Sequence, residues 1–208
     1  NTGADPILID TDPATWQMDM NLLEPFLSKK TEQRNGVCHY KKDGRRIPIL
    51  MPVHVLGNMC DMDRLMALAK QYNLTVIEDS TDALGSYYKG KHAGSFGLMG
   101  TFSYNGNKII TTGGGGMIVT DDEALARKAK HLTTQAKSDP FEYVHDEIGY
   151  NYRLVNVAAA MGVAQMEQLP GFIKRKQEVM AFYKNELLGV GDIKFQEVSA
   201  DVNANCWL

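Results

Sequence analysis

The chain has few cysteines, no long hydrophobic run and no marked excess of charge of either sign. Its 208 residues include three cysteines, Cys38, Cys60 and Cys206, which are widely spaced and odd in number. This pattern fits neither a disulfide framework nor paired zinc ligands. We therefore predict no metal site, and the cysteine usage indicates a protein of the reducing cytoplasm.

Further absences exclude whole classes of protein. No uninterrupted apolar stretch approaches the ~20 residues that a helix needs to cross a bilayer. The N-terminus has no basic segment followed by an apolar run, so it does not read as a secretory signal. The net charge of −3 gives no reason to expect nucleic acid or a membrane as a partner. The hydrophobic share of 44% is ordinary for a soluble globular protein that buries a substantial core.

Both ends of the sequence are abrupt. Residues 1–5 lead directly into the strand-like residues 6–10, and no other element precedes them. Residues 204–208 end on apolar side chains without a polar tail. We therefore expect an internal fragment of a longer chain, truncated at both ends.

Strand-like and helix-like segments alternate between these ends. Strands are expected at residues 6–10, 47–53, 74–78, 101–104 and 117–120. The run 47–53 is continuously apolar, which is typical of a strand covered on both faces. Asp61 and the pair Asp121–Asp122 offer N-caps to amphipathic helices. The alternation predicts an α/β fold with a mostly parallel central sheet and helices on both faces.

The remaining segments complete this outline. The polar and basic residues 28–46 predict a surface loop or hairpin, and a basic binding patch is the alternative. Residues 89–91 predict a second hairpin. A helix rich in small residues follows Asn156, and we expect it to be buried. Pro170 breaks this helix, and a more amphipathic helix follows the break.

Lys108 and the glycines behind it are the most informative local feature. The lysine lies on a polar turn after a short apolar strand, and residues 113–116 are four consecutive glycines. Glycines suit a backbone that passes close to something bulky that is not protein. An amine aimed at that space suggests covalent chemistry on a carbonyl, because a deprotonated lysine forms Schiff bases. The alternative is a flexible glycine loop beside a solvated lysine. A nucleotide-phosphate loop would need a different glycine spacing.

Polar side chains follow two of the expected strands where each strand ends. They are Asp79, Asp82, Ser103, Asn105, Asn107 and Lys108. Ligands collect at the carboxyl ends of strands in open α/β sheets. A pyridoxal phosphate enzyme needs a lysine for the aldehyde, a carboxylate for the pyridine nitrogen, and a hydroxyl and N–H groups for the phosphate. One face of the sheet could present all of these groups to the same ligand.

Four linked motifs carry a family resemblance. They are Val76-Ile77-Glu78-Asp79, Phe102–Lys108, Thr111–Met117 and Gly149–Arg153. In this order and spacing they resemble the nucleotide-sugar aminotransferases of the DegT–StrS group, which have the fold of aspartate aminotransferase, that is, fold type I of the PLP-dependent transferases. The similarity runs over nearly the whole chain. Residues 105–110 are similar to the branch that aminates UDP-linked 4-keto-6-deoxy sugars on the routes to bacillosamine and legionaminic acid.

The resemblance implies a role for each of several residues. Lys108 would be the Schiff-base lysine, and Asp79 would pair with the pyridine nitrogen of the cofactor, pyridoxal 5'-phosphate. Ser103 would bind the cofactor phosphate. Asn151 would reach the phosphate in the neighbouring subunit, which implies an obligate homodimer with shared active sites.

Two further residues are candidates for contact with substrate. Arg153 could bind an acceptor or donor carboxylate, and a salt bridge at the dimer seam is the alternative. His54 could line the pocket, and a hydrogen-bonded histidine at a strand end is the alternative. By the same resemblance, residues 1–168 would form the large cofactor-binding domain without its N-terminal part. Residues 169–208 would form the connecting helix and the start of the small domain.

The chain departs from the family pattern at two places. Asp82 stands where many relatives carry Gln or His near the phenolic oxygen of the cofactor, so we expect it to contact the cofactor. A carboxylate there would be repelled by the phenolate unless it is protonated or turned away. The Gly-Thr helix start that binds the phosphate in relatives lies upstream of the position that Asn1 matches.

The resemblance implies a transaminase that moves an amino group from L-glutamate to the C4 ketone of a nucleotide-linked 4-keto-6-deoxy sugar through Lys108. A histidine in place of this lysine would indicate a related sugar dehydratase. The alternative is a non-catalytic binding or structural homologue on the same fold, and the incomplete phosphate site and Asp82 are the reasons to consider it.

Overall fold

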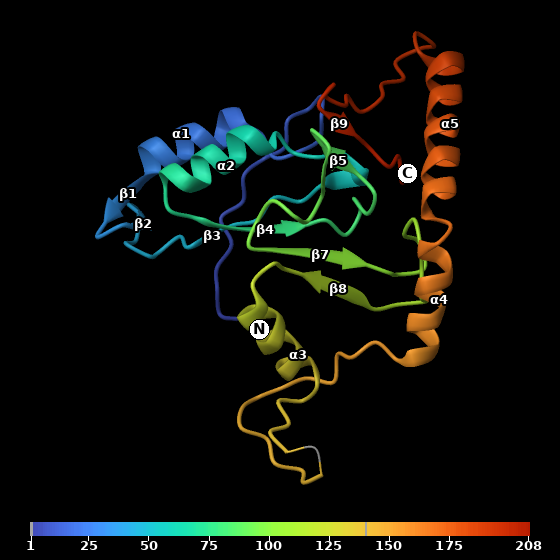
Figure 1. Cartoon of the computed structure of the whole chain (residues 1–208). Helices are drawn as coiled ribbons and strands as arrows, with labels where there is room; N and C mark the ends of the chain where they lie inside the picture. Colours follow the sequence, from blue (N-terminus) through green and yellow to red (C-terminus); the bar gives the residue numbers. More distant parts are fainter. Residues whose placement is uncertain (1, 140) are drawn as a thin grey trace.

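A four-stranded sheet lies at the centre of the computed structural model, which describes residues 2–139 and 141–208 (Figure 1). Its strands, in spatial order, are β3 (Ile49–Leu50), β4 (Thr75–Asp79), β7 (Met99–Ser103) and β8 (Gly116–Val119). Strands β3, β4 and β7 run parallel, and β8 pairs with β7 in the antiparallel direction. The prediction of an α/β fold with a mostly parallel sheet is confirmed.

Two hairpins flank the sheet, as the sequence predicts. The first joins β1 (Thr31–Arg34) to β2 (Val37–Tyr40). The second joins β5 (Tyr87–Tyr88) to β6 (Lys91–His92), and β9 (Val202–Asn203) pairs with β5 on its other side. This last pairing brings the C-terminal residues of the chain back beside the loop that follows β4 (Figure 1).

The helices are α1 (Met20–Lys30), the short 3₁₀ helix η1 (Val55–Gly57), α2 (Met62–Gln71), α3 (Glu123–Thr133), α4 (Asn156–Met166) and α5 (Leu169–Leu187). Helices α1, α2 and α3 each begin at an aspartate whose side chain caps the first turn. Asp61 accepts a hydrogen bond from the Arg64 N–H at the start of α2, and Asp122 caps α3 in the same way. Helix α4 ends at Met166, and Pro170 lies in the first turn of α5. Among the described residues, no helix is both long and apolar enough to span a bilayer.

The main core lies between the sheet and the helices α1 and α2, which lie side by side (Figure 1). Leu27 of α1 and Leu65 of α2 are completely or almost completely buried. They belong to the same cluster as Leu50 and Val76 of the sheet. Burial of such a leucine stabilises the folded state by roughly 2 kcal/mol. This cluster therefore fixes β4, and with it the position of the polar residues that follow β4.

Two of the expected strands differ from the structure. Residues 6–10 form no strand, and Leu8 is 87% exposed, because in the described part of the chain no neighbouring strand pairs with them. Within residues 47–53, Leu50 is buried but Met51 and Val53 are exposed. The expectation that this strand is covered on both faces is therefore wrong for the described residues. Its apolar residues alternate between a covered face and an open face.

Helix α4 also differs from expectation, because no described residue of it is buried. Val157 is 76% exposed and Val163 is 61% exposed. A helix that is apolar all round normally lies inside a protein or an assembly. The described residues therefore do not bury α4 as the sequence predicts. The exposed surface of this helix is a candidate contact surface.

The close contact between β7 and the loop after β6 leads to a testable prediction. A Cβ atom on Gly100 would lie 2.3 Å from the carbonyl oxygen of Gly94 and 2.5 Å from its Cα. We expect Gly100→Ala to lower the free energy of unfolding by about 3 kcal/mol, because backbone cannot yield as a side chain can. Gly114→Ala is the matched control: no atom lies within 4 Å of its added Cβ, so the change should stay within about 0.5 kcal/mol. Urea denaturation of both variants measures the difference, and equal losses would contradict the prediction.

Candidate active site

The amine of Lys108 and the carboxylate of Asp82 form an ion pair between the loops that follow β7 and β4. Lys108 Nζ lies 2.5 Å from Asp82 Oδ1, and the two side chains are only 15% and 17% exposed. The backbone N–H of Leu56 donates to Asp82 Oδ2 at 3.2 Å. The indole ring of Trp207 closes another side, with its centre 4.4 Å from Nζ. The amine of Lys108 is therefore enclosed and not solvated.

Asp79 and Ser103 lie on one face of the sheet. Asp79 is paired in register with Thr101, and Ser103 is two residues further along β7. Because side chains alternate along a strand, Asp79, Thr101 and Ser103 point to the same side. All three are partly exposed. A carboxylate and a hydroxyl are thus available at the carboxyl ends of adjacent parallel strands, next to the loops that carry Asp82 and Lys108.

The four glycines divide into two pairs with different surroundings. A Cβ atom on Gly113 or Gly114 would meet no atom within 4 Å. Gly115 has a φ of +88°, and a Cβ on it would lie 2.7 Å from Leu154 Cδ1. A Cβ on Gly116 would lie 2.6 Å from the carbonyl oxygen of Phe102. The second pair is therefore required by the protein's own packing. Only the first pair lies beside open space that a ligand could occupy.

A buried ion pair lies behind the strand end that carries Asp79. His54 Nε2 is 3.1 Å from Glu78 Oε2, and both side chains are completely buried. The carboxylate of Glu78 also accepts the backbone N–H groups of Gly94, Phe96 and Gly97 at 2.8, 2.6 and 2.7 Å. The backbone N–H of His54 donates to the carbonyl of Asp79 at 3.0 Å. His54 is therefore a hydrogen-bonded histidine at a strand end. The sequence analysis gave this role as the alternative to a residue that lines the pocket.

The burial and hydrogen bonds of this pair shift both pKa values. Burial alone lowers the pKa of His54, but hydrogen bonding with the Cys60 side chain and with Glu78 outweighs it and raises that pKa to about 9. Burial alone raises the pKa of Glu78, but hydrogen bonds from His54 and from the backbone of Gly97 and Gly94 hold it below its usual value. The Cys60 backbone N–H lies 3.4 Å from Nδ1, at the outer limit of a hydrogen bond, so the strong contact of the ring is with Glu78.

Asn151 and Arg153 lie elsewhere on this chain. Both are exposed, on the segment between α3 and α4, where Asn151 forms a single bridge with Thr134. Among the described residues, no hydrogen bond or ion pair joins either side chain to Lys108 or Asp79. The role predicted for Asn151 requires a second subunit, and both roles stay predictions.

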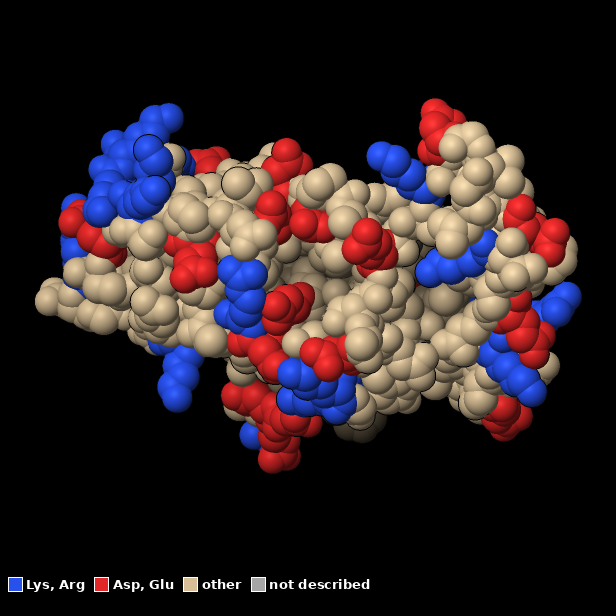
Figure 2. Space-filling view, turned by 90° about the horizontal axis from the view of Figure 1, so that it is seen from above, with Lys and Arg blue, Asp and Glu red and all other residues tan. Residues whose placement is uncertain are grey.

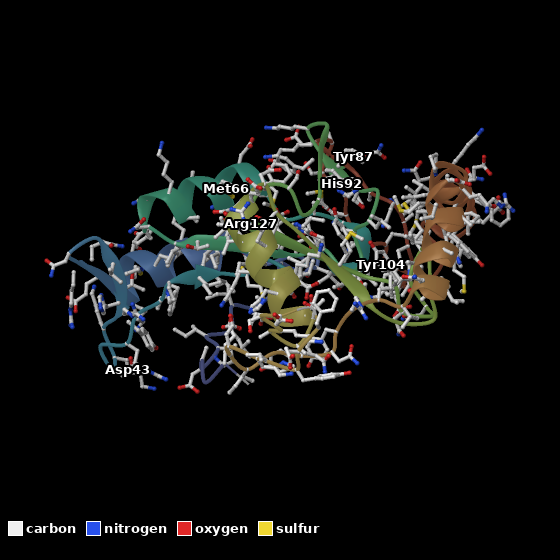
Figure 3. The ribbon with its side chains drawn as sticks, turned by 60° about the horizontal axis from the view of Figure 1, so that its bottom comes forward. Asp43, Met66, Tyr87, His92, Tyr104 and Arg127 are labelled. Atoms are coloured by element: carbon white, nitrogen blue, oxygen red, sulfur yellow. The ribbon has the colours of Figure 1, made fainter. Side chains whose placement is uncertain are left out.

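An apolar pocket of about 480 Å³ lies between α4 and the strands β7 and β8. Tyr104, labelled in Figure 3, lies at the end of β7 close to α4 and lines this pocket together with Met117 and Val163. Elsewhere on the surface, Figure 2 shows acidic and basic side chains interspersed, apart from a basic group at the end of the molecule where Figure 1 places β1 and β2. Ile110 and Thr112 also line the apolar pocket, so it adjoins the loop that carries Lys108.

Sequence reasoning missed Asn205 and Trp207. Both are buried beside the loops of Asp82 and Lys108. Trp207 follows Lys108 by about a hundred residues, and the indole N–H donates to the carbonyl of Asn107 at 2.6 Å. No local pattern marks these two residues as part of a site.

Comparisons with known proteins agree with this geometry. The profile described as the DegT/DnrJ/EryC1/StrS aminotransferase family matches residues 1–208. The GDP-perosamine synthase of Escherichia coli O157:H7 is 42% identical over 207 residues, which are 100% of this chain and 52% of that protein. The UDP-4-amino-4,6-dideoxy-N-acetyl-beta-L-altrosamine transaminase of Campylobacter jejuni is 37% identical over 147 residues, which are 70% of this chain and 39% of that protein. The chain thus spans about half the length of the curated relatives it matches, or less.

Solved structures agree as well. The crystal structure of a DegT DnrJ EryC1 StrS aminotransferase from Brucella abortus superposes with a TM-score of 0.85 at 26% identity, over 99% of this chain and 52% of that one. The PLP form of Spr1654 from Streptococcus pneumoniae superposes with a TM-score of 0.80 at 23% identity, over 99% and 54% of the two chains. The second likeness shows the fold alone.

Proposed function

Because the chain belongs to the DegT/DnrJ/EryC1/StrS aminotransferase family, we propose that the full-length protein transfers an amino group to a nucleotide-linked keto sugar. One observation carries this proposal: an almost buried lysine amine on the loop after β7, paired with the carboxylate of Asp82 and covered by the ring of Trp207. Pyridoxal 5'-phosphate is the cofactor of this family, as the sequence predicts.

The donor groups of this chain fit that cofactor. Lys108 Nζ is the amine that would bind the aldehyde covalently, and Gly113 and Gly114 on the same loop have no atom within 4 Å of an added Cβ. Asp79 is a carboxylate for the ring nitrogen, and Ser103 on the same sheet face is a hydroxyl for the phosphate. When bound, pyridoxal phosphate supplies an electron sink for the carbanion that transamination requires.

The residues of the chain then have distinct tasks. Asp82 accepts hydrogen bonds from Lys108 and from the Leu56 N–H, so its carboxylate is already neutralised and is turned toward the amine. This arrangement removes the repulsion that a second carboxylate would otherwise cause near a phenolate. Lys108 would be the general base and acid that moves the proton in this site. Asp82 would orient the amine through their ion pair.

For the substrates we propose L-glutamate as the amino donor and a nucleotide-linked 4-keto-6-deoxy sugar as the acceptor. The support is the similarity of residues 105–110 to the branch that uses such sugars, together with the nucleotide-sugar name of the Campylobacter relative. Arg153 remains the candidate for a substrate carboxylate. The three cysteines are free, which agrees with the proposed cytoplasmic location.

The test is cofactor loading followed by a substrate panel. Full-length protein is mixed with pyridoxal phosphate and reduced with borohydride, and mass spectrometry then locates the bound cofactor. Nucleotide 4-keto sugars with different nucleotides and substituents are next assayed with glutamate. Cofactor fixed on Lys108 and amination of one sugar support the proposal. A folded dimer that binds no cofactor would favour the non-catalytic homologue instead.

We also propose that a second copy of the chain completes each active site. Helix α4 is apolar all round yet exposed, and the apolar pocket beside it opens next to the loop of Lys108. An isologous dimer would cover both surfaces, since a helix of this kind is stable when it is buried. Asn151, on the segment that leads into α4, would then reach the cofactor phosphate of the partner.

This arrangement predicts complementation between two inactive variants. Lys108→Ala and Asn151→Ala proteins are unfolded together and refolded as a mixture. A hybrid dimer then contains one site with both native residues, so random pairing should recover roughly a quarter of the native activity. The control mixes Lys108→Ala with the Lys108→Ala/Asn151→Ala double variant, in which no site is complete. Activity of the first mixture that is no greater than the sum of its separate components would refute shared sites.

A further inference from the structure

Trp207 holds the loop of Lys108 by two contacts. The indole N–H donates to the carbonyl of Asn107, the residue before the lysine, at 2.6 Å. The ring faces the amine, with its centre 4.4 Å from Nζ. Only 6% of Trp207 is exposed. An aromatic face attracts a cation and excludes water, so this one side chain both orients the amine and shields it.

Asn205 holds the loop of Asp82 from the same short segment. Its side-chain amide donates to the carbonyls of Asp82 and Leu84 at 2.8 and 2.9 Å. Its Oδ1 accepts the backbone N–H of Trp207 at 2.9 Å, and its own backbone N–H donates to Ser86 Oγ at 3.0 Å. The residue is completely buried. We call residues 205–207 the bridge.

The backbone of the bridge is adapted to this task. Cys206, between the two residues, has a φ of +52°, which is uncommon for a residue other than glycine. Gly57 leaves room for Asn205, because a Cβ on Gly57 would lie 1.8 Å from Asn205 Oδ1. Such a conformation persists only where the surroundings fix it. The hydrogen bonds of Asn205 and Trp207 are the contacts that fix it here.

We propose that Trp207 and Asn205 are positioning residues that set the separation of Lys108 and Asp82. The two charged groups belong to different loops, 26 residues apart in sequence. The bridge contacts the backbone of both loops directly, at Asn107 and at Asp82. This proposal rests on the proposed function of Lys108. Displacement of a catalytic group by 1 Å can slow a reaction about 100-fold, so the bridge should affect the rate of chemistry more than substrate binding.

The test compares Trp207→Phe with the parent full-length protein. Phenylalanine keeps an aromatic face but loses the N–H that holds Asn107. We expect covalent attachment of pyridoxal phosphate to Lys108 to slow about 10-fold to 100-fold, with kcat reduced similarly and KM little changed. Asn205→Asp, which removes the amide donor from the opposite end of the bridge, is the second variant. It should slow attachment in the same way, and it keeps the test informative if Trp207→Phe does not fold.

A fluorescence measurement gives a readout that is independent of turnover. The fluorescence of Trp207 is obtained by subtracting the emission of Trp207→Phe from that of the parent. Attachment of the cofactor should quench this fluorescence, because the indole ring lies beside Nζ. The fluorescence of Trp16, obtained in the same way from Trp16→Phe, should change far less, since Trp16 is 39% exposed and lies outside the bridge.

The outcomes separate this inference from the proposed function. A parent protein that attaches no cofactor to Lys108 overturns both. Normal attachment in the parent, together with unchanged attachment rates in folded Trp207→Phe and Asn205→Asp, overturns the bridge alone. Slower attachment in these variants at an unchanged KM supports it.

Discussion

Replacement of Lys108 by alanine is expected to abolish covalent attachment of pyridoxal phosphate and to lower transamination by at least about 10³-fold. General acid–base catalysis by one group contributes roughly 10²-fold to 10⁴-fold, and this lysine would supply both the covalent attachment and the proton transfer. The enclosed position of the amine, between Asp82 and the ring of Trp207, leaves no second amine at this place among the residues that the structure describes. Single-turnover kinetics with glutamate, followed through the visible absorbance of the cofactor, measures the loss.

Lys108→Arg is the matched variant that distinguishes the positive charge of Lys108 from its role in the reaction. A guanidinium keeps a cation for Asp82 and for the indole ring, but it does not lose its proton at accessible pH. We expect Lys108→Arg to melt at nearly the temperature of the parent and to be as inactive as Lys108→Ala. Substantial transamination by either variant would show that another group carries out the chemistry. A large loss of stability in both would mean that the ion pair serves the fold.

The sequence predicted those elements that depend on residues close together in the chain. The caps at Asp61 and Asp122, the break before Pro170 and the hairpin around residues 89–91 all have the expected form. Each depends on residues within a few positions of one another. The candidate site could be predicted where strand order determines it, since Asp79 and Ser103 are the last residues of the parallel strands β4 and β7, and Lys108 lies on the loop after β7.

Contacts over long sequence distances were not predictable in this way. The roles of Asn205 and Trp207 depend on β9 pairing with β5, and a strand of two residues has no recognisable period. The burial of Glu78 could not be predicted from the neighbouring sequence either, because an acidic residue near a strand end is normally exposed. The three N–H groups that satisfy its carboxylate belong to residues 94–97.

Exposure was mispredicted where the partner surface lies outside the described residues. Met51 and Val53 on the sheet, and Val157 on α4, are apolar residues that the sequence predicted to be buried and that the structure leaves exposed. The chain spans about half the length of its relatives. We therefore interpret the exposure of these residues as the places where further segments or a second copy pack, and the proposed dimer accounts for α4.

Glu78→Gln is expected to produce the largest loss of stability of any single substitution considered for this chain. The glutamine has the same shape but removes the charge that faces His54, and removal of one partner from a buried ion pair costs about 3–5 kcal/mol. One oxygen acceptor for the backbone N–H groups of the 94–97 loop is also lost. Glu123→Gln is the matched control, because the exposed pair of Glu123 with Arg127 should contribute less than about 1 kcal/mol. Urea denaturation of the cofactor-free full-length proteins compares the two.

The same pair predicts how stability depends on pH. Because the pKa of His54 is raised from 6.5 to about 9 on folding, its contribution is fully present below about pH 6.5 and is lost as the pH rises toward 9. The pKa of Glu78 is lowered on folding, so its contribution is present above its usual value of 4.5 and is lost in more acidic solution. The parent should therefore lose roughly 3 kcal/mol between pH 6.5 and 9, and this slope should flatten in Glu78→Gln. A slope that is the same in both proteins would show that His54 is neutral in the folded state, and the pair would then be an ordinary hydrogen bond.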